Sequence, residues 1–263
     1  MKKIQISLFL IIAFLLTSCQ KEHVSSSPQN PMSFLELSKT AEDMDGNINL
    51  LAYGHKSINA APASISIDGH FFKDNGDLAL INTFKVNGVN IPQVDVNNYQ
   101  YDESIGRGNG DIAKYNLLTP SFGNTATINV SSNEFPNFTE NVNLPTIIEF
   151  TNTIDEVNTN SNLTIQWNGI NTGSKIGILI LYNAAESHKE NPTLPEDLIS
   201  VVKYIDDHIG QATFTTQELS DFPVGGIASI YIGRTIQTVI NADSKEVLVN
   251  GISINRLNWL PIL

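Results

Sequence analysis

The chain has 263 residues, of which 41% are hydrophobic and 16% charged, and its formal net charge is −12. This composition indicates a globular protein, and the length suits two domains or one large β domain. An acidic chain without a basic cluster repels phosphate backbones, so we do not expect nucleic acid to be a partner. The single cysteine, Cys19, excludes an intramolecular disulfide and a thiolate zinc site.

The first segment of the chain has the parts of a secretory signal. Two lysines precede an apolar run at 4–16, and these 13 positions are too few to cross a bilayer, which takes about 20 residues. Leu16-Thr17-Ser18-Cys19 resembles a lipobox, the signature of bacterial lipoproteins. The resemblance implies cleavage of 1–18 between Ser18 and Cys19, and attachment of lipid to Cys19, which makes the membrane a partner. The alternatives are an ordinary signal with a chance cysteine, or a short anchor.

The residues directly after the cysteine bear on which membrane, and which face of it, the protein is expected to occupy. Gln20-Lys21-Glu22-His23 resembles the export signal of Bacteroidetes-type surface lipoproteins, although a second acidic residue is missing where His23 stands. This resemblance implies the outer membrane with the protein facing the cell exterior; the alternative is a polar start to a linker. The segment 24–32 is rich in Ser and Pro, so 19–32 is expected to be a lipidated cysteine and flexible tether.

Beyond the tether, the apolar pattern has mostly period two, which is typical of β-strands. Asn87-Gly88 and Asn250-Gly251 each separate two such runs and predict tight hairpins, because a type I′ turn needs positive φ twice. The clearest early strands are predicted at 48–53, 63–67, 78–86, 126–130 and 146–150.

A domain boundary is predicted near 143–146, which gives an N-terminal domain at 33–145 and a C-terminal domain at 146–263. Leu163-Thr164-Ile165-Gln166-Trp167 alternates with Trp167 inward, and the apolar run 176–182 follows a Gly-containing loop. This order resembles immunoglobulin-like and fibronectin-type-III-like sandwiches. The predicted fold class is therefore all-β, with two antiparallel β-sandwich domains after a cleaved signal peptide and a flexible tether.

The C-terminal domain contains further local signals. The run 195–206 suits a helix or a strand, and its β-branched residues favour a strand. Thr215 and Glu218 have the spacing of a capping box at the start of a short helix. Trp259 is predicted to be a core residue. The segment 210–234 resembles the closing half of sandwich domains in uncharacterised Bacteroidetes-type lipoproteins, for which no activity is established.

Metal-binding patterns are incomplete in this sequence. Asp43, Asp45 and Asn47 form half of a calcium loop, and 74–77 is a similar acidic turn, but the remaining ligands and the distal glutamate are missing. The five histidines are not at metal-ligand spacing. Turn chemistry explains these residues, so no metal and no cofactor are predicted.

Catalytic motifs are also missing, since the sequence has no G-x-S-x-G elbow and no cysteine besides the lipid site. If the protein binds a ligand, loops at one end of a sandwich are the usual place, which gives Tyr99, Tyr101, Arg107 and Asp111 as the predicted binding loop. A carboxylate pair for glycan hydrolysis is the alternative. Its candidates are Asp95, Asp102, Glu103, Glu149, Glu186, Asp206 and Asp207.

These observations favour an outer-membrane-anchored, surface-exposed lipoprotein that is not an enzyme and acts as a binding or structural module. The candidate ligand is a glycan or a protein. Two alternatives remain: an exported carboxylate-dependent glycan hydrolase on a β scaffold, and a periplasm-facing envelope assembly factor.

Overall fold

The computed structural model describes Leu35 and residues 44–55, 64–95, 98–104, 112–169 and 175–263. Most of these residues are in β-strands, which confirms the all-β prediction. The predicted lipid site, Ser18 and Cys19, lies outside the described residues.

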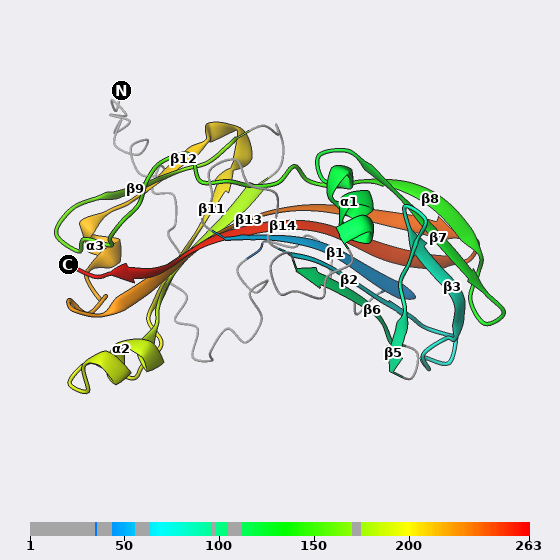
Figure 1. Cartoon of the computed structure of the whole chain (residues 1–263), viewed down its shortest axis with the longest axis horizontal. Helices are drawn as coiled ribbons and strands as arrows, with labels where there is room; N and C mark the ends of the chain where they lie inside the picture. Colours follow the sequence, from blue (N-terminus) through cyan, green and yellow to red (C-terminus); the bar gives the residue numbers. More distant parts are fainter. Residues whose placement is uncertain (1–34, 36–43, 56–63, 96–97, 105–111, 170–174) are drawn as a thin grey trace, which may run out of the picture.

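The largest layer is an eight-stranded sheet with the order β11-β10-β13-β14-β1-β2-β6-β5. Figure 1 shows its two longest strands, β13 and β14, running through the middle of the molecule. The strands of this sheet are β1 (Gly46–His55), β2 (Ser64–Phe71), β5 (Gln93–Asp95), β6 (Asn98–Ser104), β10 (Lys175–Tyr182), β11 (Ser200–Asp206), β13 (Ile227–Ala242) and β14 (Lys245–Pro261).

Two smaller sheets and short helices complete the fold (Figure 1). One small sheet has the order β4-β3-β7-β8 and the other pairs β12 with β9. Their strands are β3 (Ile81–Val86), β4 (Val89–Asn90), β7 (Thr125–Ser132), β8 (Phe138–Asn143), β9 (Leu163–Gln166) and β12 (Gln211–Phe214). The helices are α1 (Ile112–Leu118), α2 (Ala184–Glu190) and α3 (Thr216–Leu219), with short 3₁₀ turns η2 (Thr119–Ser121) and η3 (Asp207–Ile209).

The β13–β14 hairpin joins the two halves of the molecule. Its first strand pairs with β10 from Ala228 to Arg234, at one end of the hairpin. β14 pairs in parallel with β1, from Val247 opposite Gly46 onward. One hairpin therefore supplies sheet partners to segments from both sides of the predicted domain boundary.

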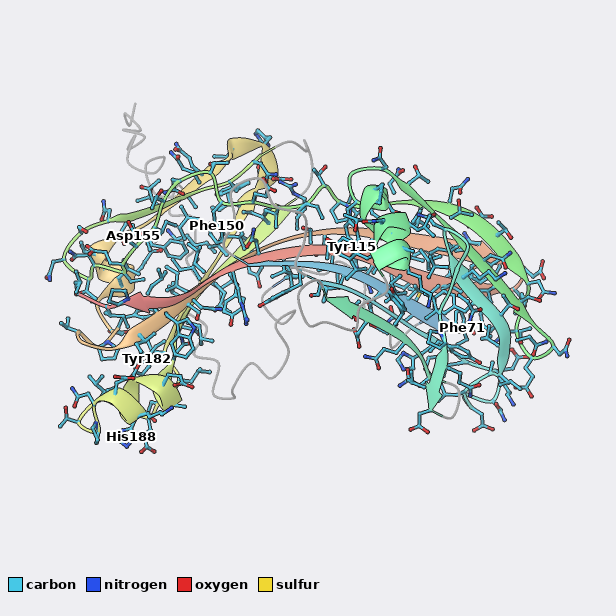
Figure 2. The ribbon with its side chains drawn as sticks, viewed as in Figure 1. Phe71, Tyr115, Phe150, Asp155, Tyr182 and His188 are labelled. Atoms are coloured by element: carbon cyan, nitrogen blue, oxygen red, sulfur yellow. The ribbon has the colours of Figure 1, made fainter. Side chains whose placement is uncertain are left out.

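Two separate cores lie on the same face of the shared sheet. Every second residue of a strand points to the same face, and the β13 residues of the two cores belong to one such series along the strand. In one half Phe71 packs edge-to-face on Phe135, with ring centroids 5.2 Å apart. In the other half Trp167 and Tyr182 are buried. Figure 2 shows the labelled Phe71 and Tyr115 in one half, and Phe150 and Tyr182 in the other.

The predicted boundary near 143–146 separates the residues of the two cores. It does not separate two sheets, because the main sheet contains strands from both sides of it. Leu144 belongs to the first core and Ile148 to the second. The first core also contains four residues from the C-terminal hairpin, namely Ile240, Ala242, Val247 and Val249. The structure thus has two cores and one continuous main sheet.

The opposite face of the main sheet has a smaller apolar cluster. It consists of the buried residues Leu35, Leu179, Ile252 and Ile254. Leu35 is only 7% exposed, so the start of the described chain is fixed on this second face.

The two hairpin predictions have different outcomes. Asn87 and Gly88 have φ values of 49° and 77° and connect β3 to β4, which confirms the first hairpin. The second prediction is wrong, because Asn250 and Gly251 lie inside β14. The turn between β13 and β14 instead contains Asp243, with a φ of 54°.

Packing explains why Gly251 is needed within a strand. A Cβ atom at Gly251 would lie 2.8 Å from both Leu144 Cδ2 and Pro145 Cδ, so the glycine permits close approach of the segment that links the cores. Asn250 is buried and its side-chain amide donates to Asn49 Oδ1 over 2.8 Å.

Three other local predictions are confirmed. The run 195–206 contains the strand β11. The capping box at Thr215 and Glu218 starts α3, with both reciprocal hydrogen bonds present. Trp167 is a core residue with 3% exposure.

Candidate functional site

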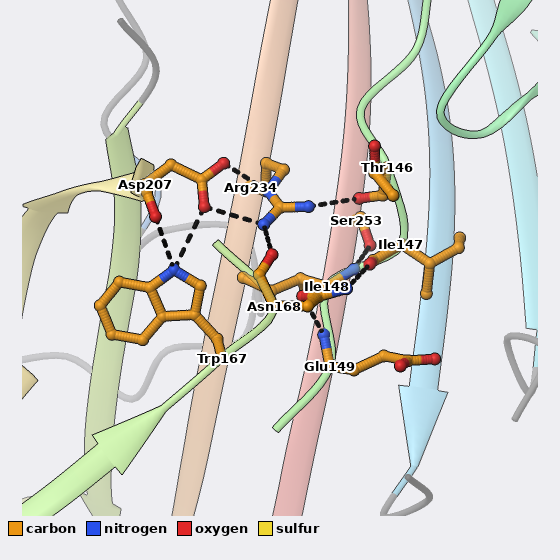
Figure 3. Close-up of polar contacts among 9 residues, drawn as sticks. All are labelled: Thr146, Ile147, Ile148, Glu149, Trp167, Asn168, Asp207, Arg234 and Ser253. Carbon is orange, nitrogen blue, oxygen red and sulfur yellow. Dashed lines mark hydrogen bonds and ion pairs between the residues drawn. The ribbon is translucent and has the colours of Figure 1, made fainter. Parts of the chain in front are cut away.

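The segment 146–150, predicted to be a strand, forms no strand in the structure. Only its last residue, Phe150, makes an isolated β-bridge, to Trp167, and side chains satisfy much of the remaining backbone (Figure 3). Asn168 donates to the Ile147 carbonyl and accepts from the Glu149 N–H, over 2.7 Å and 2.9 Å. Ser253 Oγ accepts from the Ile148 N–H over 2.9 Å. The strand prediction at this position is wrong because hydroxyl and amide groups replace a neighbouring strand.

A buried ion pair lies at the centre of this arrangement. Arg234 Nε is 2.8 Å from Asp207 Oδ2, and Arg234 Nη2 donates to Asp207 Oδ1 over 2.8 Å. The other guanidinium contacts are to the carbonyls of Thr146 and Asn168, at 3.1 Å and 2.8 Å. Trp167 Nε1 donates to Asp207 Oδ1 over 3.1 Å. We refer to Asn168, Asp207, Arg234 and Ser253 as the polar clasp.

The polar clasp is not open to a ligand. The side chains of Asp207 and Arg234 are both 0% exposed, and their charges neutralise each other. Asp207 is one of the predicted candidates for glycan hydrolysis, but this ion pair occupies both of its oxygens. The polar clasp therefore fixes the linking segment on the shared sheet, and its ion pair has no exposed surface for recognition.

The predicted binding loop is not formed as expected. Tyr99 and Tyr101 lie on β6 with 3% and 7% exposure, inside the first core, so their assignment to a binding loop is wrong. Tyr99 accepts from the Ile81 N–H over 2.7 Å through its hydroxyl. Arg107 and Asp111 lie outside the described residues.

Two carboxylates of the incomplete calcium patterns, Asp45 and Asp74, face a lysine, and Asp43 lies outside the described residues. Lys245 Nζ is 3.1 Å from Asp45 Oδ1 and 2.7 Å from Asp74 Oδ1. A hydrogen bond from the Glu246 N–H, together with Lys245, holds the pKa of Asp45 below its usual range. Across the described ranges, no group of three His, Cys, Asp or Glu residues is arranged to hold a metal ion.

An exposed aromatic side chain lies at an irregularity in β14. Trp259 is 60% exposed, so the prediction that it is a core residue is wrong. The register between β13 and β14 shifts here, where Asn258 and Trp259 both lie opposite Ser229. Leu257 and Leu260 on either side belong to the second core, so the extra residue of this bulge places Asn258 and Trp259 away from that core.

Polar groups beside this tryptophan are connected in a short chain. Asn183 Nδ2 donates to Ser229 Oγ over 2.9 Å, and Ser229 Oγ donates to Asn258 Oδ1 over 3.2 Å. Asn183 is the N-cap residue of α2, yet its side chain makes no capping bond. We call Asn183, Ser229, Asn258 and Trp259 the bulge site; it combines an exposed ring with amides of fixed orientation.

The backbone of Trp259 is strained, with a φ of 61°. The left-handed conformation costs an ordinary L-residue about 1–2 kcal/mol. Strain of this kind is concentrated at functional positions, where the surrounding structure compensates for it. At this strained position the ring is 60% exposed, and the neighbouring Asn258 is hydrogen-bonded to Ser229.

A cation and two tyrosines continue the same face of the sheet beyond the bulge site. The Arg256 guanidinium lies 5.1 Å from the centre of the Tyr53 ring. Burial raises the pKa of Tyr53 to about 12, although the positive charge of Arg256 acts in the opposite direction. Tyr231 is opposite Arg256 on β13.

Comparisons with known proteins do not assign this chain to a family. No protein-family model matches it, and no curated protein matches it significantly. Among the residues that the structure describes, the helices are too short or too polar to span a membrane.

Proposed function

We propose that this chain is an outer-membrane-anchored lipoprotein, exposed on the cell surface, that acts as a non-catalytic binding module through its bulge site. The observation that carries the binding role is Trp259, a large aromatic residue that is exposed. It follows Asn258 directly, and Ser229 joins the amide of Asn258 to that of Asn183. Tryptophan is enriched among the residues that dominate binding energy, because one ring supplies a large contact area.

The sequence supports the anchor. Cys19 is the only cysteine and follows a lipobox-like segment, so lipid attachment leaves no free thiol. Two acyl chains on the thiol-linked glyceride and one on the amine each contribute about 0.8 kcal/mol per buried methylene, which is enough for stable attachment. The tether from 20 to 32 reaches at most about 45 Å when extended. In this proposal the two packed halves serve as immunoglobulin-like sandwich modules that share the main sheet.

The anchor and the exposure are testable in cells that make the protein. We expect radiolabelled palmitate to be incorporated into the wild-type chain and not into the Cys19→Ser variant. Protease added to intact cells should digest the wild-type chain, as detected by an antibody to the C-terminal half. Labelling without digestion would contradict surface exposure and favour a periplasm-facing protein, and no labelling would contradict the anchor.

A further inference from the structure

We propose that the bulge site binds an uncharged sugar ring of a glycan, which stacks on Trp259 while its hydroxyls bond to Asn183 and Asn258. This inference rests on the proposed binding function and adds the class of ligand. It is drawn from three properties of the site: ring exposure, unused hydrogen-bonding capacity and charge.

The bulge supplies the stacking surface. Trp259 is 60% exposed, whereas the other tryptophan, Trp167, is 3% exposed and donates its N–H to Asp207. The extra residue of the bulge lets Asn258 and Trp259 share the side of β14 that faces away from the second core. The site therefore combines the aromatic ring of Trp259 with the side-chain amide of Asn258.

The polar chain leaves a donor and an acceptor for a ligand. Ser229 Oγ uses Asn183 Nδ2 and Asn258 Oδ1, which fixes both amides. Within the described part of the chain, no partner contacts the remaining Asn258 Nδ2 or Asn183 Oδ1. A sugar hydroxyl both donates and accepts, so hydroxyls of one ring can complement the donor and the acceptor.

Charge favours a neutral ligand over an acidic one. The four side chains of the bulge site are uncharged, and the chain as a whole has a net charge of −12. A polyanionic glycan would therefore be repelled at long range and would meet no cation among these four side chains. Arg256, on the same face of the sheet, lies over the Tyr53 ring. An aromatic side chain of a protein partner could also stack on Trp259, but it would not use the amide pair.

Tryptophan fluorescence of the full chain in detergent tests the proposal, because Trp167 is buried and only Trp259 is accessible to acrylamide. The probes are neutral oligosaccharides of glucose, galactose, mannose and xylose at millimolar concentration, with oligogalacturonate as the acidic comparison. We expect at least one neutral probe to protect Trp259 from quenching, and oligogalacturonate to give no protection. Trp259→Phe should retain binding, measured by calorimetry, and Trp259→Ala should weaken it about tenfold or more.

The amide pair needs its own variants. Asn258→Asp replaces the free donor by an acceptor and should weaken binding of the neutral probe several-fold without loss of stability. Leu117→Ala, at an exposed apolar residue on α1, is the matched control and should bind like the wild type.

The outcomes separate this inference from the proposed function. If no neutral probe protects Trp259, or if Asn258→Asp binds normally, the inference is wrong, while anchoring and exposure are decided by the labelling and protease experiments. If a neutral probe binds at Trp259 and is then cleaved, the ligand class is confirmed and the non-catalytic function is wrong.

Discussion

Arg234 is one of the largest side chains that the fold buries completely. Removing a guanidinium from water is costly, and the cost is offset because every branch of this group meets an oxygen: two from Asp207 and one each from the carbonyls of Thr146 and Asn168. The ion pair is therefore better described as a device for positioning the linking segment than as a large net source of stability.

A double-mutant cycle tests this view of Arg234. Arg234→Met alone should lower the free energy of unfolding by about 3–5 kcal/mol, because Asp207 stays buried without its cation. Adding Asp207→Leu should restore part of that loss. Urea unfolding followed by Trp167 fluorescence measures both, and Lys73→Met, which breaks a half-exposed surface pair with Glu134, serves as the control. A single variant as stable as the wild type would show that the ion pair does not hold the linking segment.

Asp68 provides a residue-scale prediction about pH. Burial raises its pKa, while a hydrogen bond from Asn49 and the charge of His70 act against this. Its contribution to stability is fully present below the unfolded pKa of about 3.9 and is lost as pH rises through the folded pKa. Asp68→Asn should therefore match the wild type in strong acid and exceed it at neutral pH.

Urea midpoints from strong acid to neutral pH measure this difference for Asp68. Asp155→Asn, at an exposed position, controls for the loss of one negative charge. A difference between Asp68→Asn and the wild type that stays constant with pH, or that grows toward acid, would contradict the prediction.

At the scale of elements, two glycines with similar sequence contexts have different roles. Gly88 has a φ of 77° and open space where a Cβ would lie, whereas Gly251 meets Leu144 and Pro145 at 2.8 Å. Gly88→Ala should cost about 1 kcal/mol from backbone strain alone. Gly251→Ala should cost about 1–3 kcal/mol, because the neighbouring segment must shift.

Denaturant unfolding with a distant structural probe separates these two effects. The Gly251→Ala variant should also change the amide chemical shifts of the segment 146–149, and Gly88→Ala should not. Equal shifts at that segment would show that Gly251 is not needed for close packing.

Elements with local causes could be predicted from the sequence. The Asn87-Gly88 turn and the capping box at Thr215 depend on a few consecutive residues, so their patterns were sufficient. Asn250-Gly251 has the same pattern as a turn, but contacts from residues about a hundred positions earlier in the chain keep it extended. Local signals could not distinguish these two cases.

The candidate site was harder to predict for a related reason. Trp167 follows strict alternation, and its burial was expected; Trp259 lies at a bulge, and one additional residue reverses which side chains face the core. Alternation could have indicated the burial of Arg234, since it continues the inward series of Ile230 and Ile232. No sequence pattern indicates that Asn183 and Asn258 both bond to Ser229.

At the scale of the whole molecule, the shared sheet makes the two cores interdependent. Residues 33–145 alone would lack β14 as the parallel partner of β1, and four side chains of the first core. We expect this fragment, expressed by itself, to give a poorly dispersed amide spectrum. A well-dispersed spectrum would show that the N-terminal half is an independent domain.

The full chain should unfold in one transition for the same reason. Loss of Trp167 fluorescence reports on the second core, and hydrogen exchange in β2 reports on the first. Their urea midpoints should coincide. Two separated midpoints would show that the β13–β14 hairpin can detach from one half while it stays in the other.

The parallel pairing of β1 with β14 brings together residues 201 positions apart, as at Asn49 and Asn250. A ribosome delivers β1 and its neighbour β2 long before β14, so the first core lacks its last four side chains until the C-terminal hairpin has been made. If the chain is exported as proposed, this late closing step would leave the first core incomplete while the polypeptide is threaded through a translocation channel.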